Sequence, residues 1–321
     1  MKKEKPNVSV ITLTYNQADY IRECIEGILM QKTDFPIELI IHDDASTDGT
    51  SDIIKEYAEK YPDIIKPIIQ KENQYSQKKS FYPILGKCID KASGKYIAFC
   101  EGDDYWTDPQ KLQKQVEFLE SHPDIVYTCH RYLTQYDKDE QKELFPNKFL
   151  DKYKNAVGFE FDLQYVFKYD WVTKTLTAVF RADKLKNDNL RDSSFYCDTH
   201  RVYHLLSQGN GYCFNFVGGV YRKQAGGIWS QEKTLKKLHT EVKKWEDIYK
   251  KLPSKFNKQK FRRFYTLYIH ESIKNRKMFH VENLSQLKLL FQTPADYINL
   301  RKEHKHQNEL DRIKNFKLNQ D

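Results

Sequence analysis

The chain has 321 residues, a length that allows one large or two modest domains with a sizeable core. Its formal net charge is +8, but residues 231–321 hold 22 Lys/Arg against 11 Asp/Glu, so the basic excess lies there. Because the rest is slightly acidic, we do not expect the whole chain to bind nucleic acid; an anionic membrane surface is the partner that suits the basic segment. The sequence contains no apolar run of ~18 residues and no signal-peptide pattern, so we expect a cytoplasmic protein.

Six cysteines are scattered along the chain, and none belongs to a C-x-x-C pair. Most lie in apolar runs, where a small thiol is easily buried. We therefore expect reduced, structural cysteines and no zinc site.

The first hundred residues alternate between strand and helix patterns. Val8–Thr14 is rich in β-branched residues, and apolar residues then recur at helical spacing from Ile21 to Leu29. Further strands are expected at Ile37–Ile41, Ile64–Ile69 and Gly94–Cys100, and further helices at about Ser51–Tyr61 and Pro83–Ala92. This order predicts an α/β fold with a right-handed, doubly wound sheet that binds ligands at the carboxyl ends of its strands.

The pattern is weaker after Trp106. The expected elements are a helix at Pro109–Ser121, a strand at Ile125–His130, a polar loop at Asp137–Asn155, ordered structure at Thr175–Phe180, a helix at Thr199–Gln208, and strands at Tyr212–Phe216 and Val220–Arg222. From about Thr234 the chain is lysine-rich and amphipathic, with a break at Pro253. We favour helices that pack on the main domain with their lysines outside; the alternative is binding to anionic lipid.

Acidic residues follow two of the predicted strands. Glu101, Asp103 and Asp104 come directly after the strand that ends at Cys100, and Asp43 and Asp44 follow the strand at Ile37–Ile41. Carboxylates at strand ends suit a hard cation such as Mg²⁺ or Mn²⁺, which keeps positions for water or phosphate oxygens. The alternatives are a solvated turn for the first group, and caps of the next helix for Asp43 and Asp48.

Three segments together resemble the family 2 glycosyltransferases with the GT-A fold: Val8–Asn16, Asp43–Asp48 and Glu101–Asp104. The resemblance covers roughly residues 6–230. It implies a Rossmann-like, mixed sheet in which residues 1–106 bind the nucleotide sugar and residues 107–232 bind the acceptor, followed by a basic helical extension at 233–321. It also implies an enzyme that moves a sugar from a nucleoside diphosphate donor, usually UDP, to an acceptor hydroxyl with inversion.

The same resemblance implies roles for single residues. It places Thr14, Tyr15, Asn16, Asp44 and Asp103 at the donor. Within this set, Tyr15 and Asp44 would contact the nucleobase and Asp103 the ribose. Asp104 would hold Mg²⁺ or Mn²⁺ against the diphosphate, where positive charge stabilises the leaving group. Tyr15 could instead serve only to pack its turn.

Family members place a catalytic carboxylate at the start of a later helix, ahead of a strand that ends in a Tyr-Arg pair. Here Asp198 precedes the helix and Tyr221-Arg222 ends the strand. The resemblance thus implies that Asp198 is the general base, with Asp192 as the other candidate. Asp198 is equally suited to cap the helix.

A departure from the family pattern follows the Tyr-Arg pair. Gln224 stands where many relatives carry a histidine that approaches the diphosphate or metal, so water could take that place. The pair Gly226-Gly227 could hinge a loop over the donor or form an ordinary turn. Trp106 and Trp229 could stack on a sugar or belong to the core.

The expected acceptor is a glycan or lipid-linked saccharide made at the inner membrane face. One competing interpretation is a nucleotidyltransferase, but the turn after the first strand, Thr14–Gln17, lacks the glycines of a phosphate loop. Another is a non-catalytic module with this fold at a membrane surface. The presence of all four acids, Asp44, Asp103, Asp104 and Asp198, favours an enzyme over that module.

Overall fold

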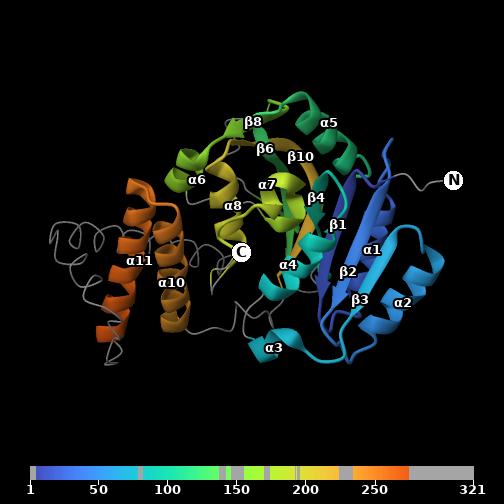
Figure 1. The fold of residues 1–321 in the computed structure, drawn as a ribbon, viewed down its shortest axis with the longest axis horizontal. Helices are drawn as coiled ribbons and strands as arrows, with labels where there is room; N and C mark the ends of the chain where they lie inside the picture. Colours follow the sequence, from blue (N-terminus) through green and yellow to red (C-terminus); the bar gives the residue numbers. More distant parts are fainter. Residues whose placement is uncertain are drawn as a thin grey trace, which may run out of the picture. The chain divides into compact units, whose positions relative to one another are not determined.

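The computed structural model describes residues 5–78, 82–136, 142–145, 155–169, 174–191, 193, 196–223 and 234–274 (Figure 1). The chain forms two compact units, Met1–Gln231 and Glu232–Asp321.

The first unit is built around a 10-stranded mixed sheet within the described residues. Its strands are β1 (Val8–Thr14), β2 (Ile37–Asp43), β3 (Ile65–Ile69), β4 (Tyr96–Phe99), β5 (Tyr105–Trp106), β6 (Ile125–Tyr136), β7 (Lys142–Phe145), β8 (Gly158–Phe161), β9 (Val179–Arg181) and β10 (Asn210–Lys223). The strand order is β3-β2-β1-β4-β9-β6-β10-β5, with β7 beside β6 and β8 beside β10.

Helices connect these strands. They are α1 (Ile21–Leu29), α2 (Thr50–Lys60), α3 (Gln74–Lys78), α4 (Tyr82–Lys91), α5 (Lys111–Ser121), α6 (Leu163–Tyr169), α7 (Ala182–Lys186) and α8 (Asp198–Leu206), with a 3₁₀ turn at Thr175–Thr177. In Figure 1, α1 and α2 lie on one side of strands β1 to β3 and α4 lies on the other. A sheet covered on both faces requires nearly continuous apolar strands, as Val8–Thr14 and Ile37–Asp43 are.

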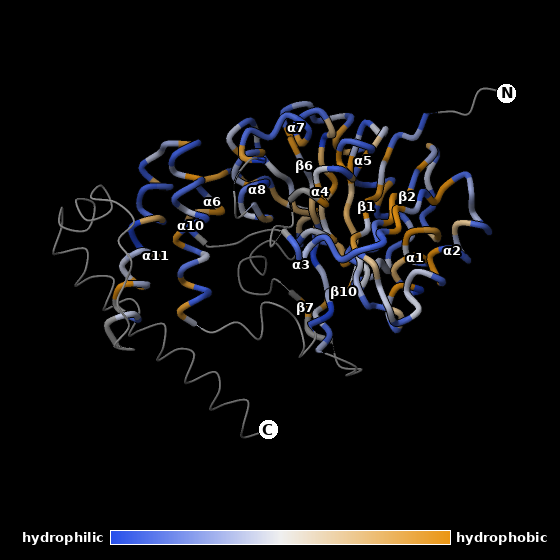
Figure 2. Tube along the Cα trace, turned by 60° about the horizontal axis from the view of Figure 1, so that its bottom comes forward, coloured by the Kyte–Doolittle hydropathy of each residue, from blue (hydrophilic) through white to orange (hydrophobic). Residues whose placement is uncertain are grey.

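The four strands β3, β2, β1 and β4 are parallel, so their carboxyl ends meet at one edge. Beyond them, β9 pairs antiparallel with β4 and β6, and β10 runs parallel to β6. The apolar residues concentrate in the central strands and in the helix faces that cover them (Figure 2). This arrangement confirms the predicted doubly wound α/β fold and places the first two acidic clusters at the same edge.

Several predicted boundaries were wrong. The strand expected at Ile125–His130 continues to Tyr136, and the two strands expected between 212 and 222 form one bent strand, β10, whose register shifts twice between Phe214 and Val220. The segment expected to be a polar loop contains β7, which is built of Lys142–Phe145 and pairs with β6. Cross-strand pairing stabilises these polar stretches as strands although they lack an alternating pattern.

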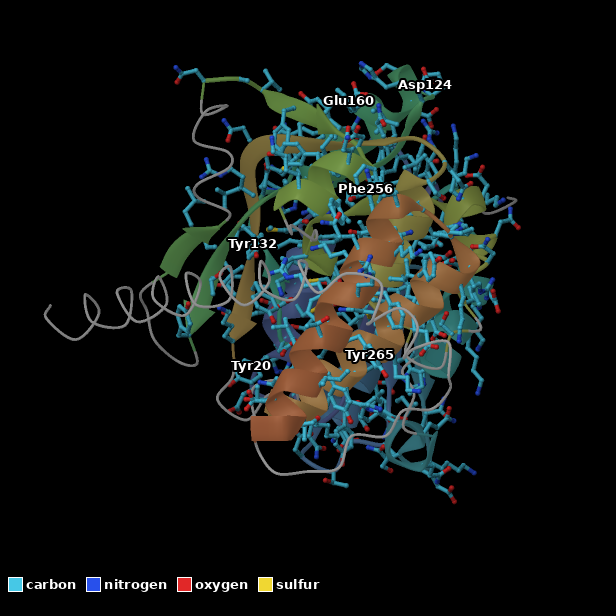
Figure 3. The ribbon with its side chains drawn as sticks, turned by 90° about the vertical axis from the view of Figure 1, so that its left-hand side faces the viewer. Tyr20, Asp124, Tyr132, Glu160, Phe256 and Tyr265 are labelled. Atoms are coloured by element: carbon cyan, nitrogen blue, oxygen red, sulfur yellow. The ribbon has the colours of Figure 1, made fainter. Side chains whose placement is uncertain are left out.

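The second unit contains α10 (Thr234–Lys251) and α11 (Lys255–Lys274), which pack against each other. Trp245 stacks on Phe264 and Tyr249 on Phe261, with ring centroids 6.2 Å and 6.4 Å apart. Tyr265, labelled on α11 in Figure 3, is also buried. The aromatic face predicted from the sequence therefore contributes to a helix–helix core.

Among the described residues, no helix combines the length and apolar character needed to cross a membrane. All six cysteines are free thiols, and five of them are buried.

Candidate functional site

The loops that follow β1 and β2 are joined by hydrogen bonds at the carboxyl edge of the sheet. The backbone N–H of Asn16 donates to Ser46 Oγ over 2.8 Å, and the N–H of Thr47 donates to Asn16 Oδ1 over 2.8 Å. Asn16 and Ala45 have φ angles of 51° and 64°, a left-handed conformation that is unusual outside glycine. Such conformations persist where the surroundings fix them, often at functional sites.

Tyr15 and Asp44 lie on these two loops. The Tyr15 side chain is 46 % exposed at this edge. Asp44 is buried, and its two carboxylate oxygens accept the backbone N–H groups of Gln74 and Tyr75 at 2.8 Å and 2.9 Å. Asp44 therefore holds the start of α3, and its remaining lone pairs leave capacity for a further donor.

The other loop acids have structural partners. Asp43 accepts hydrogen bonds from the hydroxyls of Ser46 and Ser51, and Asp48 accepts from Thr50 Oγ1 and from the N–H of Ala18. Both carboxylates thus organise the loop and the start of α2. The N-cap of α2 is Gly49, without a side-chain cap hydrogen bond, so neither aspartate caps this helix as the sequence alternative proposed.

The acidic turn after β4 is held against the end of β1. The N–H of Gly102 donates to Leu13 O over 3.1 Å. A Cβ at position 102 would lie only 2.7 Å from Thr14 Oγ1 and 2.4 Å from Gln17 Oε1, so only glycine allows this approach. Thr14 therefore lies directly against the turn that carries Asp103 and Asp104.

Burial raises the pKa values of the carboxyl groups in this turn. Burial raises the pKa of Asp103, and it raises the pKa of Asp104 well above its usual range, with the charges of Asp103 and Glu101 adding to the effect. The pKa of Glu101 rises to about 7 through burial and the nearby charge of Asp198. Carboxyl groups crowded in this way are stabilised as carboxylates by a cation.

Arg222, at the end of β10, holds the acidic turn, a role that the sequence had not assigned to it. Its backbone N–H donates to Asp104 Oδ1 and its Nη1 donates to Asp103 O, both over 2.9 Å. The guanidinium also forms an ion pair with Glu23 and lies over the rings of Tyr20 and Tyr105. The Tyr221-Arg222 pair was the signal that could have revealed it.

Asp198 begins α8 with its side chain 49 % exposed. Thr175 Oγ1 donates to Asp198 Oδ2 over 2.9 Å, and the buried guanidinium of Arg201 forms an ion pair with Oδ1. Arg201 in turn lies over the rings of Phe99 and Phe180. Asp198 therefore has a fixed orientation, supported by two residues that the sequence analysis did not single out.

Acidic residues from separate segments of the chain lie near the Tyr221 side chain. Burial raises the pKa of Tyr221 to about 12, together with the negative charges of Asp104, Asp103, Glu101 and Asp198. The structure thus places the predicted base near the predicted metal and ribose ligands.

One predicted contact is corrected. Trp106 is 1 % exposed, its indole N–H donates to Leu176 O over 2.9 Å, and it belongs to the main hydrophobic core. A side chain enclosed in this way does not offer a surface to an acceptor, so the core alternative holds for Trp106. Gln224, Trp229, Asp192 and the pair Gly226-Gly227 lie outside the described residues.

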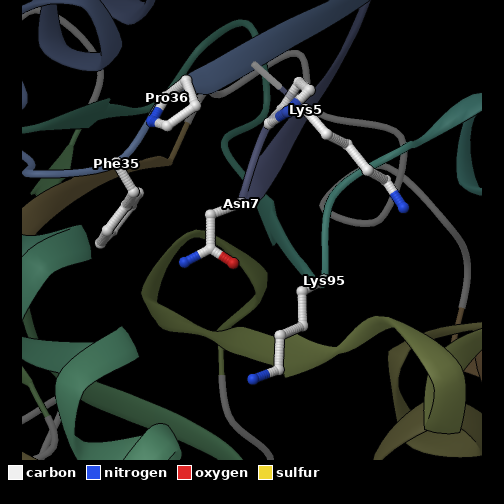
Figure 4. Close-up of a pocket in the computed structure, with 6 residues that line it drawn as sticks. Lys5, Asn7, Phe35, Pro36 and Lys95 are labelled. Carbon is white, nitrogen blue, oxygen red and sulfur yellow. The ribbon is translucent and has the colours of Figure 1, made fainter.

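A pocket of about 320 Å³ lies at the opposite edge of the sheet (Figure 4). Its lining includes Asn7, Pro36 and Lys95, which immediately precede β1, β2 and β4. Because the acids lie at the carboxyl ends of these strands, this pocket is separate from the candidate site. The Lys95 ammonium is moreover paired with Glu120.

Within the described part of the chain, no three His, Cys, Asp or Glu side chains are arranged to hold a metal ion by themselves. A site for Mg²⁺ commonly uses only one or two carboxylates and completes its shell with water and substrate phosphates. Asp104 fits that role, because its buried carboxylate accepts one hydrogen bond, from Arg222, and lies among other acids.

Comparison with known proteins decides the family. The model of glycosyl transferase family 2 matches residues 9–172, a segment that contains both acidic clusters. The chain belongs to glycosyl transferase family 2. An uncharacterized protein of Mycobacterium tuberculosis is 44 % identical over 239 residues, which are 74 % of this chain and 64 % of that relative. The chain thus matches less than two thirds of the relative's length.

Solved structures show the same GT-A fold for this family 2 member. TarS of S. aureus, in complex with UDP-GlcNAc, matches with a TM-score of 0.61 at 17 % identity. The match covers 92 % of this chain and 81 % of the TarS chain. The mannosyltransferase PcManGT of Pyrobaculum calidifontis, in complex with GDP-Man and Mn²⁺, has a TM-score of 0.55 at 18 % identity, with coverages of 95 % and 85 %. The fold implied by the sequence resemblance is therefore confirmed.

Proposed function

We propose that the chain is an inverting glycosyltransferase that transfers a sugar from a UDP-sugar to a hydroxyl of a glycan or lipid-linked acceptor. One observation carries the proposal: Asp103 and Asp104 follow β4 and are held by Arg222, while Asp198 is paired with Arg201, which lies over Phe99 at the end of the same strand. In open α/β sheets the carboxyl edge is where ligands bind. Membership of glycosyl transferase family 2 supports the reaction class.

The donor would lie across the loops after β1 and β2. The exposed ring of Tyr15 offers a face for a nucleobase, and Asp44 offers a further acceptor for a base N–H. Thr14 and Asn16 fix the shape of this loop through their hydrogen bonds to Gln17 and Thr47. The complexes of TarS with UDP-GlcNAc and of PcManGT with GDP-Man support a nucleotide-sugar donor.

Asp104 would hold Mg²⁺ or Mn²⁺, and Asp103 would bind the ribose. The metal would supply positive charge to the departing diphosphate. PcManGT is described with Mn²⁺, which supports the choice of metal. Arg222 keeps both acids in place from the side of β10.

Asp198 would accept the proton of the acceptor hydroxyl. Its carboxylate is half exposed, as a base that meets an incoming acceptor must be, while Thr175 and Arg201 fix its orientation. A base placed in hydrogen-bond reach of the nucleophile allows direct displacement, and displacement from the face opposite the leaving group gives inversion.

The basic second unit would contact an anionic membrane surface where lipid-linked acceptors lie. Trp245 and Phe261 are 3 % and 2 % exposed, so lysines rather than aromatic side chains would make this contact. Sedimentation of the full chain with vesicles containing anionic lipid, but not with neutral vesicles, tests it. Equal recovery with both kinds of vesicle would remove the membrane from the proposal.

The decisive assay is nucleotide release from a panel of UDP-, GDP- and CDP-sugars with Mn²⁺, Mg²⁺ or EDTA. We expect release from a UDP-sugar that requires the metal and increases with a saccharide acceptor. Failure to release nucleotide from any donor in the presence of metal and acceptor would overturn the proposed function.

A further inference from the structure

Strands β6 and β10 carry a row of tyrosines on one face beside the candidate site. The two strands are parallel, with Tyr221 opposite Thr134 and Lys223 opposite Tyr136. Because side chains alternate along a strand, Tyr132, Tyr136, Tyr221 and Lys223 share one face, which we call the tyrosine face. Arg222 projects from the other face toward Glu23.

Ring contacts confirm this placement. The rings of Tyr132 and Tyr221 meet edge to face with centroids 6.2 Å apart. Tyr132 is labelled on β6 in Figure 3. Tyr136, at the outer end of the strand, is 45 % exposed. Tyr132 is 4 % exposed and packs against Tyr221, so the part of the tyrosine face that is open to a ligand consists of Tyr221, beside the acids, and Tyr136 at the outer end.

Two lysines lie over these rings. Lys174 Nζ is 4.2 Å from the centroid of the Tyr221 ring, and Lys223 Nζ is 4.9 Å from that of Tyr136 and 3.4 Å from its hydroxyl. Lys223 is exposed and Lys174 is half-buried. Among the residues that the structure describes, neither ammonium forms an ion pair with a carboxylate. Positive charge is thus available here, next to a site that is otherwise acidic.

We propose that the tyrosine face, with Lys174 and Lys223, binds the acceptor, and that this acceptor is an acidic saccharide carrying carboxylate or phosphate groups. Flat tyrosine rings pack on the apolar faces of sugars, and ammonium groups attract anions while a neutral saccharide would not need them. The two lysines would also offset the repulsion between an anionic acceptor and the carboxylates at the edge of the sheet. This inference rests on the proposed function, because it names the acceptor of the same reaction.

The first experiment measures binding of three probes by calorimetry: an oligosaccharide of glucuronic acid, its neutral methyl ester, and an oligomer of glycerol phosphate. We expect the wild-type protein to bind at least one acidic probe more tightly than the methyl ester, with a preference that weakens as salt is added. Comparison of the two acidic probes identifies the anion. Equal affinity for the methyl ester, or no binding of either acidic probe at low salt, would overturn the inference.

Variants then connect binding to the tyrosine face. We expect Lys174→Gln and Lys223→Gln each to weaken binding of the acidic probe about two- to fivefold, the range of partly exposed ion pairs, and Lys223→Arg to restore it. Lys60→Gln is the matched control. Lys60 also lies over a tyrosine ring, that of Tyr61, but it belongs to α2 and not to the tyrosine face. An equal loss in Lys60→Gln, or no loss in either of the other glutamine variants, would contradict the assignment.

The outcome can be separated from that of the proposed function. If nucleotide release fails for every donor while the acidic saccharide still binds through Lys174 and Lys223, the reaction is wrong and the binding surface stands. If nucleotide is released and transferred equally to acidic and neutral acceptors, the reaction stands and the acceptor assignment is wrong. Thermal unfolding of each variant confirms that it is folded.

Discussion

The backbone N–H of Arg222 donates a 2.9 Å hydrogen bond to the carboxylate of Asp104, a residue 118 positions earlier in the chain. The Arg222 side chain adds a second 2.9 Å bond, to the carbonyl of Asp103. Strand β10 thus fixes the acidic turn after β4, which β1 also holds through the hydrogen bond from Gly102 N–H to Leu13 O. The geometry of the candidate site depends on this long-range contact.

We expect Arg222→Met to reduce activity with the donor more than it reduces the stability of the protein. The backbone bond to Asp104 remains, but Asp103 O loses its donor and Glu23 its partner. The Arg222 side chain is 6 % exposed but Glu23 is 55 % exposed, so the main loss is the bond to Asp103 O, at about 1–3 kcal/mol. We expect a tenfold or larger loss in kcat/KM for the donor. Donor kinetics and thermal unfolding check this.

The control is Arg22→Met. Arg22 also pairs with a glutamate, Glu56, but both side chains are about half exposed. Exposed pairs contribute little to stability. If both variants lose activity equally, the contact of Arg222 with the acidic turn is not what sustains the donor site.

Asp198→Asn tests the proposed base. The amide keeps the size of the side chain and a partner for Thr175, but it cannot accept a proton. We expect sugar transfer to fall about 10²–10⁴-fold while the affinity for the nucleotide changes little. Asp183→Asn on α7, which replaces an exposed aspartate, should retain full transfer. Retained transfer in Asp198→Asn would move the base to another carboxylate, with Asp192 as the next candidate.

The parallel half of the fold was predictable because its signals are local. Continuous β-branched runs such as Val8–Thr14 and the helical spacing from Ile21 to Leu29 identify a covered parallel sheet. The acids at its carboxyl edge were predictable for the same reason. The later strands were not, since Lys142–Phe145 becomes a strand only through pairing with β6.

The residues that hold the candidate site residues in place could not be predicted from the sequence. Arg201 resembles any helical arginine until the structure places it between Asp198 and the rings of Phe99 and Phe180. Trp106 follows the acidic turn directly, yet it points into the core and binds Leu176 O. Such roles depend on contacts between distant segments, which spacing does not reveal.

Glu38 should stabilise the sheet in a pH-dependent way. Its carboxylate is 1 % exposed; burial opposes ionisation, but hydrogen bonds from Lys66, Ser9 and Ser93 lower its pKa from 4.5 to about 2. Because the folded pKa is below the unfolded value, the stabilisation is present above pH 4.5 and is lost as the pH falls toward 2. We expect Glu38→Gln to lose about 2–3 kcal/mol at pH 7, and less at pH ~3.

Urea unfolding of both proteins across this range measures the difference, and Glu56→Gln, which removes an exposed carboxylate, is the control. A difference between wild type and Glu38→Gln that stays constant down to pH ~2 would show that the charge of Glu38 is not responsible.

Lys111 should reduce stability at neutral pH. The side chain is 0 % exposed, its Nζ lies 4.1 Å from the Trp106 ring centroid, and it has no hydrogen-bond partner among the described residues. Burial lowers its pKa from 10.5 to about 7, so the unfolded chain binds more protons between these values and stability rises with pH.

Lys111→Met keeps the length of the side chain and removes the amine. We expect it to stabilise the protein by about 1–2 kcal/mol at pH 7 or below, with a gain that shrinks as the pH approaches 10. Lys114→Met, on the same helix, removes a lysine that is 39 % exposed and paired with Asp108, and should bring no such gain. Destabilisation by Lys111→Met at every pH would mean that the amine has a favourable partner.

The measurement that tests the central claim most directly is calorimetric titration of UDP into the wild-type protein and into Asp104→Asn, with Mn²⁺ or with EDTA. We expect UDP to bind the wild type only with the metal, and Asp104→Asn to weaken this binding at least tenfold. UDP binding that needs no metal, or that is unchanged in Asp104→Asn, would contradict the placement of a metal-assisted donor site at the acids after β4.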